Sequence, residues 1–180
     1  MCEILSFCNE VLNEKEIVIP LELTNDPNFE MYYDFEQKKI FINENRIRDN
    51  YKKYNAPLLK YVRIILYHEL GHALDNSLKD INEDIDQCYT KINENPLSNQ
   101  VSLLYTRINK NSLQAEINAW SIAETLKEPQ FTNLFFKVKK NELKQHKVTS
   151  KLEKKRIILN IEKTKGEINL INLRDQASKL

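Results

Sequence analysis

Glycine is scarce in this chain, which contains only Gly71 and Gly166 among its 180 residues. Without a glycine-rich segment, the chain has no phosphate-binding loop of the kind that holds nucleotides. Cysteine is scarce too: Cys2, Cys8 and Cys88 are odd in number and fit neither a disulfide framework nor a cysteine-rich zinc site. Such cysteine usage is typical of a protein kept in a reducing compartment.

The chain also lacks long apolar runs. No uninterrupted apolar stretch approaches the ~20 residues that a membrane-spanning helix needs. The N-terminal segment up to Pro20 carries four glutamates and no basic stretch followed by an apolar one, so no Sec-type signal peptide is expected. We therefore expect a cytoplasmic protein without a membrane span. Export without a cleavable signal stays open.

Composition is otherwise that of a globular protein, with 41% apolar and 29% charged residues. A chain of this length can bury a substantial core without disulfides or a structural metal. A metal in this protein is therefore expected to serve chemistry rather than folding.

Charge is unevenly distributed along the chain. Residues 1–136 contain 14 Lys and Arg against 21 Asp and Glu, a net charge of −7, whereas residues 137–180 contain 13 against 5, a net charge of +8. We interpret residues 1–136 as the principal domain and residues 137–180 as a basic, mostly helical extension. Such a segment binds nucleic acid or an acidic partner, forms a solvated helix, or docks on the acidic domain. Of these readings, the solvated helix and the helix docked on the acidic domain are favoured.

The apolar pattern predicts an α+β fold, with a small sheet near the N-terminus and helices elsewhere. Residues 57–76 are apolar on nearly every face and begin with Pro57, which predicts a helix at the centre of its domain. Before the central helix, the pattern predicts a helix at 3–13, a strand at Ile17–Leu23, and a hairpin of strands at 29–34 and 39–42. After it, we expect a loop at 77–100 with at most a short helix, and one or two helices at 101–127, the second beginning near Ser112. Residues 131–180 are expected to be mostly helical, with 166–173 either helix or strand.

The central helix carries the sequence His68-Glu69-Leu70-Gly71-His72, an H-E-x-x-H motif. Residues four apart lie on one face of a helix, so both imidazoles can bind one metal ion. Glu69 is rotated ~100° from His68, which places it beside the metal as a general base for the attacking water. Gly71 in mid-helix indicates that another backbone approaches closely there, since glycine costs ~1 kcal/mol relative to alanine. The competing interpretation is a pair of core histidines next to a buried salt bridge.

A catalytic zinc ion has three protein ligands and one open position. Glu116 is the best candidate for the third ligand, because Ala119 and Ala123 share its helix face and allow that helix to approach closely. Trp120 is expected to pack beside it.

Asp75 lies a further turn along from His72 and suits a supporting role or an exposed helix end. His146, among lysines, reads as a solvated histidine. Asp80 to Asp86 alternate like a calcium loop, but its required glycine and glutamate are missing.

At these residues the chain resembles the gluzincin group of zinc metallopeptidases, whose hallmark is H-E-x-x-H on one helix and a glutamate ligand from a later helix. The resemblance covers residues 30–127 and implies that His68, His72 and Glu116 bind Zn²⁺ and that Glu69 is the catalytic base. Two branches are similar. The ImmA/IrrE-like intracellular peptidases share a strand like Lys39–Asn43 and a following Glu-x-x-Ala helix. The catalytic domain of anthrax lethal factor and the Pro-Pro endopeptidases share the continuation of the motif through Asp75.

The two branches differ from this chain in detail. The separation of His72 and Glu116 is long for the ImmA/IrrE-like pattern. In the lethal-factor branch a tyrosine two turns before the glutamate stabilises the oxyanion, and that position here is Asn109. Tyr105, one turn earlier, is the candidate for that role. The resemblance implies a zincin-like fold, with a small sheet packed on the active-site helix and its edge available to a peptide substrate by strand addition.

The sequence thus predicts a zinc-dependent metalloendopeptidase that hydrolyses peptide bonds in a protein or peptide substrate. One alternative is an inactive or regulatory binding protein on a peptidase scaffold, which uses the basic segment to bind an acidic partner or nucleic acid. Another is the same chemistry deployed as a toxin or effector inside another cell.

Overall fold

The computed structural model describes the backbone of residues 3–177 and the side chains of residues 3–171. The chain forms two compact units. The first comprises the chain up to Leu78 together with Ala115–Leu143, and the second comprises Lys79–Gln114 and the chain from Lys144 onward. The predicted domain boundary at 136/137 falls inside one long helix, α6 (Thr132–Ala177), rather than between the units.

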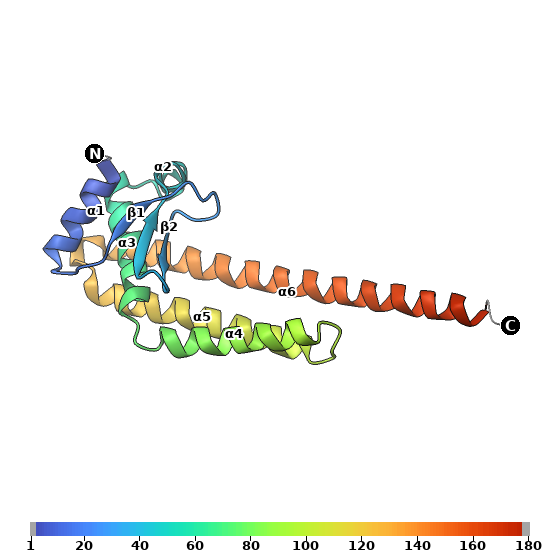
Figure 1. The fold of residues 1–180 in the computed structure, drawn as a ribbon. Coiled ribbons are helices and arrows are strands. Elements are labelled where there is room, and N and C mark those ends of the chain that lie inside the picture. The colour runs from blue at the N-terminus through green and yellow to red at the C-terminus, as the bar shows by residue number, and fades with distance from the viewer. Residues whose placement is uncertain (1–2, 178–180) are drawn as a thin grey trace. The chain divides into compact units, whose positions relative to one another are not determined.

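The chain is mostly helical with one small sheet, so the α+β class is confirmed. None of the helices in residues 3–177 combines the length and the apolar character needed to cross a membrane. The elements, coloured along the chain in Figure 1, are α1 (Glu3–Glu14), β1 (Leu21–Leu23), β2 (Met31–Asp34), β3 (Lys39–Ile42), α2 (Glu44–Asn50), a 3₁₀ turn (Tyr51–Tyr54), α3 (Leu58–Leu74), α4 (Leu78–Glu94), α5 (Val101–Leu126), a 3₁₀ turn (Pro129–Phe131) and α6.

The sheet of the first unit has the order β1-β3-β2, with β1 parallel and β2 antiparallel to β3. The predicted hairpin of β2 and β3 is confirmed. Its turn is shaped by Asp34, whose Oδ1 accepts the N–H groups of Glu36 and Gln37 at 2.9 and 2.8 Å, and by Lys38 in the left-handed region at φ 55°. A local polar side chain of this kind satisfies the turn backbone and sets the hairpin register.

The core of the first unit is built around α3, as the sequence predicts. Nine of its seventeen residues are buried, and α1 and β2 pack against it. In Figure 1 the sheet lies alongside this helix. Pro57 immediately precedes the first helical residue, where its missing N–H costs no hydrogen bond. The largest fully buried side chain is Trp120 of α5, and it contacts Phe135 of α6 edge-on.

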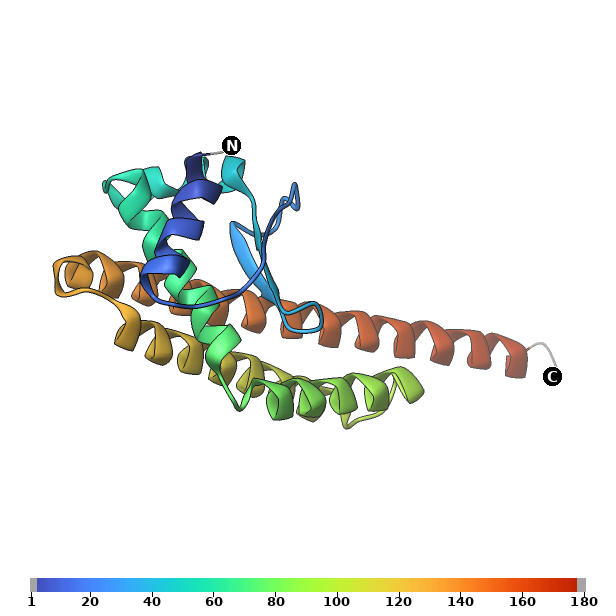
Figure 2. The same ribbon diagram turned by 60° about the vertical axis from the view of Figure 1, so that its left-hand side comes forward.

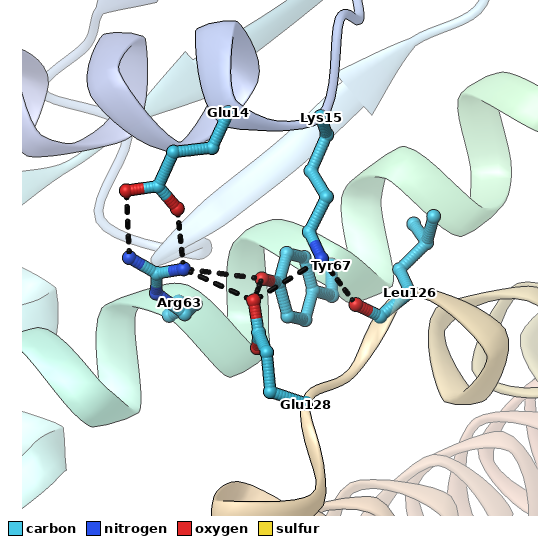
Figure 3. A network of polar contacts seen from close by, with 6 residues as sticks. All are labelled: Glu14, Lys15, Arg63, Tyr67, Leu126 and Glu128. Carbon is cyan, nitrogen blue, oxygen red and sulfur yellow. Dashed lines mark hydrogen bonds and ion pairs between the residues drawn. The ribbon is translucent and has the colours of Figure 1, made fainter.

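A polar network fastens α3 to its neighbours (Figure 3). The guanidinium of Arg63 lies 2.7 Å from a carboxylate oxygen of Glu14 and 3.2 Å from Oε1 of Glu128. The hydroxyl of Tyr67 donates to the same Glu128 oxygen at 2.8 Å, and Lys15 contacts it at 3.1 Å. These contacts tie α1 and the segment after α5 to the helix that carries the histidines.

In the second unit, α4 and the first half of α5 form an antiparallel pair (Figure 2). Their shared core contains the buried residues Cys88, Ile92, Val101 and Ile108, and Ile161 of α6 packs against it. The prediction of a loop over 77–100 is wrong, because α4 occupies most of it. Its apolar residues recur every three or four positions from Leu78 onward, so a polar segment still buries one stripe.

Two alternatives that the sequence leaves open are decided, and one predicted strand is shorter than expected. α5 is continuous, without a break near Ser112. The first strand is only Leu21–Leu23, because Glu16 has a left-handed φ of 56° and pairing with β3 begins only at Leu21. Residues 166–173 are helical, within α6.

Candidate metal centre

The two histidines of the motif lie one turn apart on α3, with ring centroids 4.7 Å from each other. Glu116 reaches them from α5. One of its carboxylate oxygens lies 3.2 Å from Nε2 of His68, and the other lies 3.6 Å from Nε2 of His72. The structure therefore brings together the three residues that the sequence selects as metal ligands.

The donor set fits a zinc ion. One donor atom from each of the three residues can be chosen so that all lie within 4.8 Å of one another. Zinc bonds of ~2.0–2.1 Å at a tetrahedral angle would separate neighbouring donors by about 3.3 Å. The 3.2 Å separation between one Glu116 oxygen and Nε2 of His68 is close to this value, and the other Glu116 oxygen lies 3.6 Å from Nε2 of His72. Two imidazoles and a carboxylate are also the donor chemistry of a catalytic zinc site with one open position.

The close approach of α3 and α5 depends on Gly71. A Cβ atom built on Gly71 would lie 2.1 Å from the carbonyl oxygen of Ala119 and 2.8 Å from its Cα atom, so no larger residue fits without moving a backbone. Ala119 and Ala123 are both completely buried. The prediction that a glycine and a stripe of alanines let two helix backbones approach is confirmed.

The electrostatics of the three ligands are coupled. Burial opposes ionisation of Glu116, but hydrogen bonds from His68 and His72 outweigh it and hold the pKa of Glu116 well below its usual range. Burial likewise opposes protonation of His72, but the hydrogen bond to Glu116 and the charge of Glu69 raise its pKa. The carboxylates of Glu116 and Glu69 therefore favour a positive charge beside them.

Glu69 lies beside this cluster and is only 7% exposed. Burial raises the pKa of Glu69, against the opposing effect of His68 and His72. Its Oε2 accepts the backbone N–H of Tyr33 in β2 at 2.9 Å. This hydrogen bond fixes one carboxylate oxygen and leaves Oε1 as the atom that can accept a proton.

The bond from Tyr33 also shows which side of β2 faces Glu69. Glu30 and Asn43 form a hydrogen-bonded pair at the end of the β2–β3 ladder, through the N–H of Asn43 at 2.8 Å. Such pairs alternate in an antiparallel ladder, so Tyr33, which is opposite Ile40, directs its N–H away from β3. β2 is thus an edge strand whose outward backbone groups lie next to Glu69.

The imidazole of His68 is held by stacking on an aromatic ring rather than by a second hydrogen bond. Trp120 stacks on it with ring centroids 4.3 Å apart and planes inclined by 18°. The Nδ1 atom of His68 is buried and has no hydrogen-bond partner in the described part of the chain. The expectation that Trp120 packs beside the site is met, but its direct contact with a ligand histidine has no signal in residue spacing.

Asp75 stands outside the ligand cluster, as the sequence predicts, and connects the end of α3 to α5. Its Oδ1 accepts from the hydroxyl of Ser77 at 2.7 Å, and its Oδ2 accepts from the amide of Asn118 at 3.1 Å. Burial opposes ionisation of Asp75, but these hydrogen bonds lower its pKa. Sequence reasoning missed Asn118, which lies two residues beyond Glu116 and helps fix the turn of α5 that carries the ligand.

The remaining candidates belong to the second unit. Tyr105 packs its ring against Tyr89 with centroids 6.2 Å apart, and its role at an oxyanion stays a prediction. Asn109 donates its side-chain amide to the carbonyl of Ser150 at 3.1 Å. His146 is half-buried rather than fully solvated. Asp84, from the stretch that resembles a calcium loop, forms a salt bridge with an arginine of α5.

Comparisons with known proteins found no matching family model, no matching curated protein and no matching solved structure. The geometry of the site is therefore the basis for assigning a function.

Proposed function

We propose that this chain is a zinc-dependent metallopeptidase of the gluzincin type with a zincin-like fold. The observation that carries the proposal is the convergence of His68, His72 and Glu116 from two helices, with the buried carboxylate of Glu69 beside them. Neither helix alone supplies this arrangement. A structural salt bridge would not need a glycine to bring the helices into backbone contact.

In the proposed reaction His68, His72 and Glu116 hold the zinc ion. When bound, the ion would supply Lewis-acid activation of a water molecule and of the scissile carbonyl group. Glu69 accepts a proton from the attacking water at Oε1 and transfers it to the leaving amine.

The substrate class we propose is an extended peptide or protein segment. The outward backbone groups of β2 lie next to Glu69, so a segment that added to this edge as a further strand would run past the catalytic carboxylate. Main-chain hydrogen bonding of this kind requires an extended substrate but little sequence identity. Side-chain preferences would be decided by contacts outside the strand itself.

The test is Glu69→Gln, which keeps the shape of the side chain and removes its basicity. The zinc-loaded variant should retain one zinc ion per chain and lose hydrolysis of an unstructured peptide library by at least about a hundredfold, a typical contribution of a general base. Products would be identified by mass spectrometry, with Glu124→Gln on α5, a glutamate that pairs with Lys139 outside the ligand cluster, as a control. Full activity in Glu69→Gln would refute the mechanism. Zinc binding without hydrolysis in the unmodified chain would favour the regulatory alternative.

A further inference from the structure

The second unit contains a small cavity that the proposed peptidase site does not use. It lies between α5 and α6, has a volume of about 230 Å³, and is lined by residues of both helices. Thr106 and Leu113 line it from α5, and three lysines with His146 line it from α6. All of these residues belong to the second unit, so the cavity is complete within it.

Lys147, Lys151 and Lys154 give this cavity its character. Their spacing of four and three residues places them on one face of α6. No aspartate or glutamate lines the cavity. Within the described part of the chain, none of the three forms a salt bridge with a carboxylate, although other lysines of α6 do. Three uncompensated positive charges therefore surround one small hollow, which focuses a positive potential there.

Lys154 and His146 have polar groups without an ionic partner at the cavity. The ammonium group of Lys154 donates to the hydroxyl of Thr106 at 2.6 Å, which leaves its charge without an anion. The Nε2 atom of His146 is buried and has no hydrogen-bond partner in residues 3–171. His146 lines the hollow, so its ring serves as a reporter of anything bound there.

We propose that this cavity binds the phosphate group of a small phosphomonoester. A phosphate dianion can accept hydrogen bonds from several donors at once, which matches the three lysines. Leu113 and the aliphatic stems of the lysines provide an apolar wall for a small organic body. The three lysines span about 10 Å of helix, a length that suits a small molecule and is too short to follow a nucleic-acid backbone for many nucleotides.

The test uses phenyl phosphate and the NMR signal of the His146 ring in the full-length chain. The chain has only three histidines, and the other two lie in the first unit, where they serve as an internal reference. A His146→Gln variant assigns the signal. At fixed pH, phenyl phosphate should shift the His146 resonance in a saturable way, whereas phenol should not.

Two matched double variants locate the binding. Lys147→Ala with Lys151→Ala removes two charges from the cavity wall and should weaken phenyl phosphate binding by at least about tenfold, as expected for two charge-assisted hydrogen bonds. Lys144→Ala with Lys155→Ala removes the same charge from exposed positions of α6 outside the cavity and should change binding by less than about twofold at moderate salt. Alanine preserves the helix in both.

Several results would overturn the proposal. These are the absence of a saturable shift of His146, equal weakening in the two double variants, or an equal response to phenol. Binding of a single-stranded oligonucleotide without binding of phenyl phosphate would identify a nucleic-acid surface instead.

Discussion

The replacement of Gly71 by alanine provides a quantitative test of how the metal site is built. The added Cβ would lie 2.1 Å from the carbonyl oxygen of Ala119 and 2.7 Å from its carbonyl carbon. Contacts below 3.0 Å are not tolerated, so the two backbones must separate by roughly 1 Å. Both obstructing atoms are backbone atoms, which cannot rotate out of the way.

Two opposing terms set the size of the effect. Alanine should gain ~1 kcal/mol over glycine in the interior of a helix. Forcing extra volume into a packed interface costs 1–3 kcal/mol, with the upper end expected where backbones collide. The net loss of unfolding free energy should be about 2 kcal/mol, which lowers Tm by about 4–8 °C for a chain of this size.

The same substitution should also disrupt the ligand set. Ala119 lies one turn beyond Glu116 on α5, so a shift of α5 moves the Glu116 carboxylate away from the histidines. Zinc ligands tolerate distance errors of only about 0.2 Å, so zinc affinity should fall by at least about tenfold. Thermal unfolding followed by circular dichroism and zinc competition with a chromophoric chelator would measure both effects.

Gly166→Ala is the matched control. A Cβ atom at Gly166 would meet nothing within 4 Å. This variant should be as stable as the unmodified protein or more stable by up to ~1 kcal/mol, with the same zinc affinity. Equal stability and equal zinc affinity in Gly71→Ala and Gly166→Ala would refute the reasoning.

Two further predictions concern polar groups in the first unit. Burial raises the pKa of Glu30 despite the hydrogen bond from Tyr61, so the folded state binds this proton more tightly than the unfolded chain. The free energy of unfolding should therefore fall as pH rises from the unfolded value of about 4.3 through the higher folded pKa, and urea titrations should show a flatter pH profile in Glu30→Gln. Tyr67→Phe removes a hydrogen bond to Glu128 and should cost about 1 kcal/mol. As a control, Tyr89→Phe changes a half-exposed tyrosine and should leave the free energy of unfolding almost unchanged in the same urea titration. Equal losses in the two variants would contradict this role of the network.

The cluster of His68, His72 and Glu116 was the most predictable part of the molecule, because its geometry follows from helical spacing. The four-residue separation of His68 and His72 decides that they share a face once the segment is helical, and its apolar composition makes it helical. The alanines after Glu116 indicate close packing, which selects that glutamate over others. Neither inference needed the position of any distant atom.

The contacts around the site could not be predicted, because they depend on the relative placement of segments far apart in the sequence. The stacking of Trp120 on His68 and the bond from the backbone of Tyr33 to Glu69 are of this kind. Every residue of an edge strand except proline has a backbone N–H, so the sequence does not indicate which of them bonds Glu69. The network around Glu128 likewise joins residues from α1, α3 and the segment after α5.

The error over α4 has a different cause. Its segment is polar and acidic on average, and an average composition of this kind predicts a loop. A helix needs only one apolar stripe to pack against a neighbour, and Leu78, Cys88 and Ile92 provide it. Periodicity was the better signal there.

In β1 the apolar run was longer than the strand, since only Leu21–Leu23 has a pairing partner.

The most direct test of the central claim is the zinc content of the purified protein by plasma mass spectrometry. The unmodified chain should contain about one zinc ion after zinc is supplied, as a complete set of two histidines and one carboxylate predicts. His68→Ala should lose the ion, Glu116→Ala should bind it weakly, and His146→Ala should retain it. Absence of zinc from the unmodified chain, or the same zinc content in all three variants, would contradict the assignment of His68, His72 and Glu116 as a metal centre.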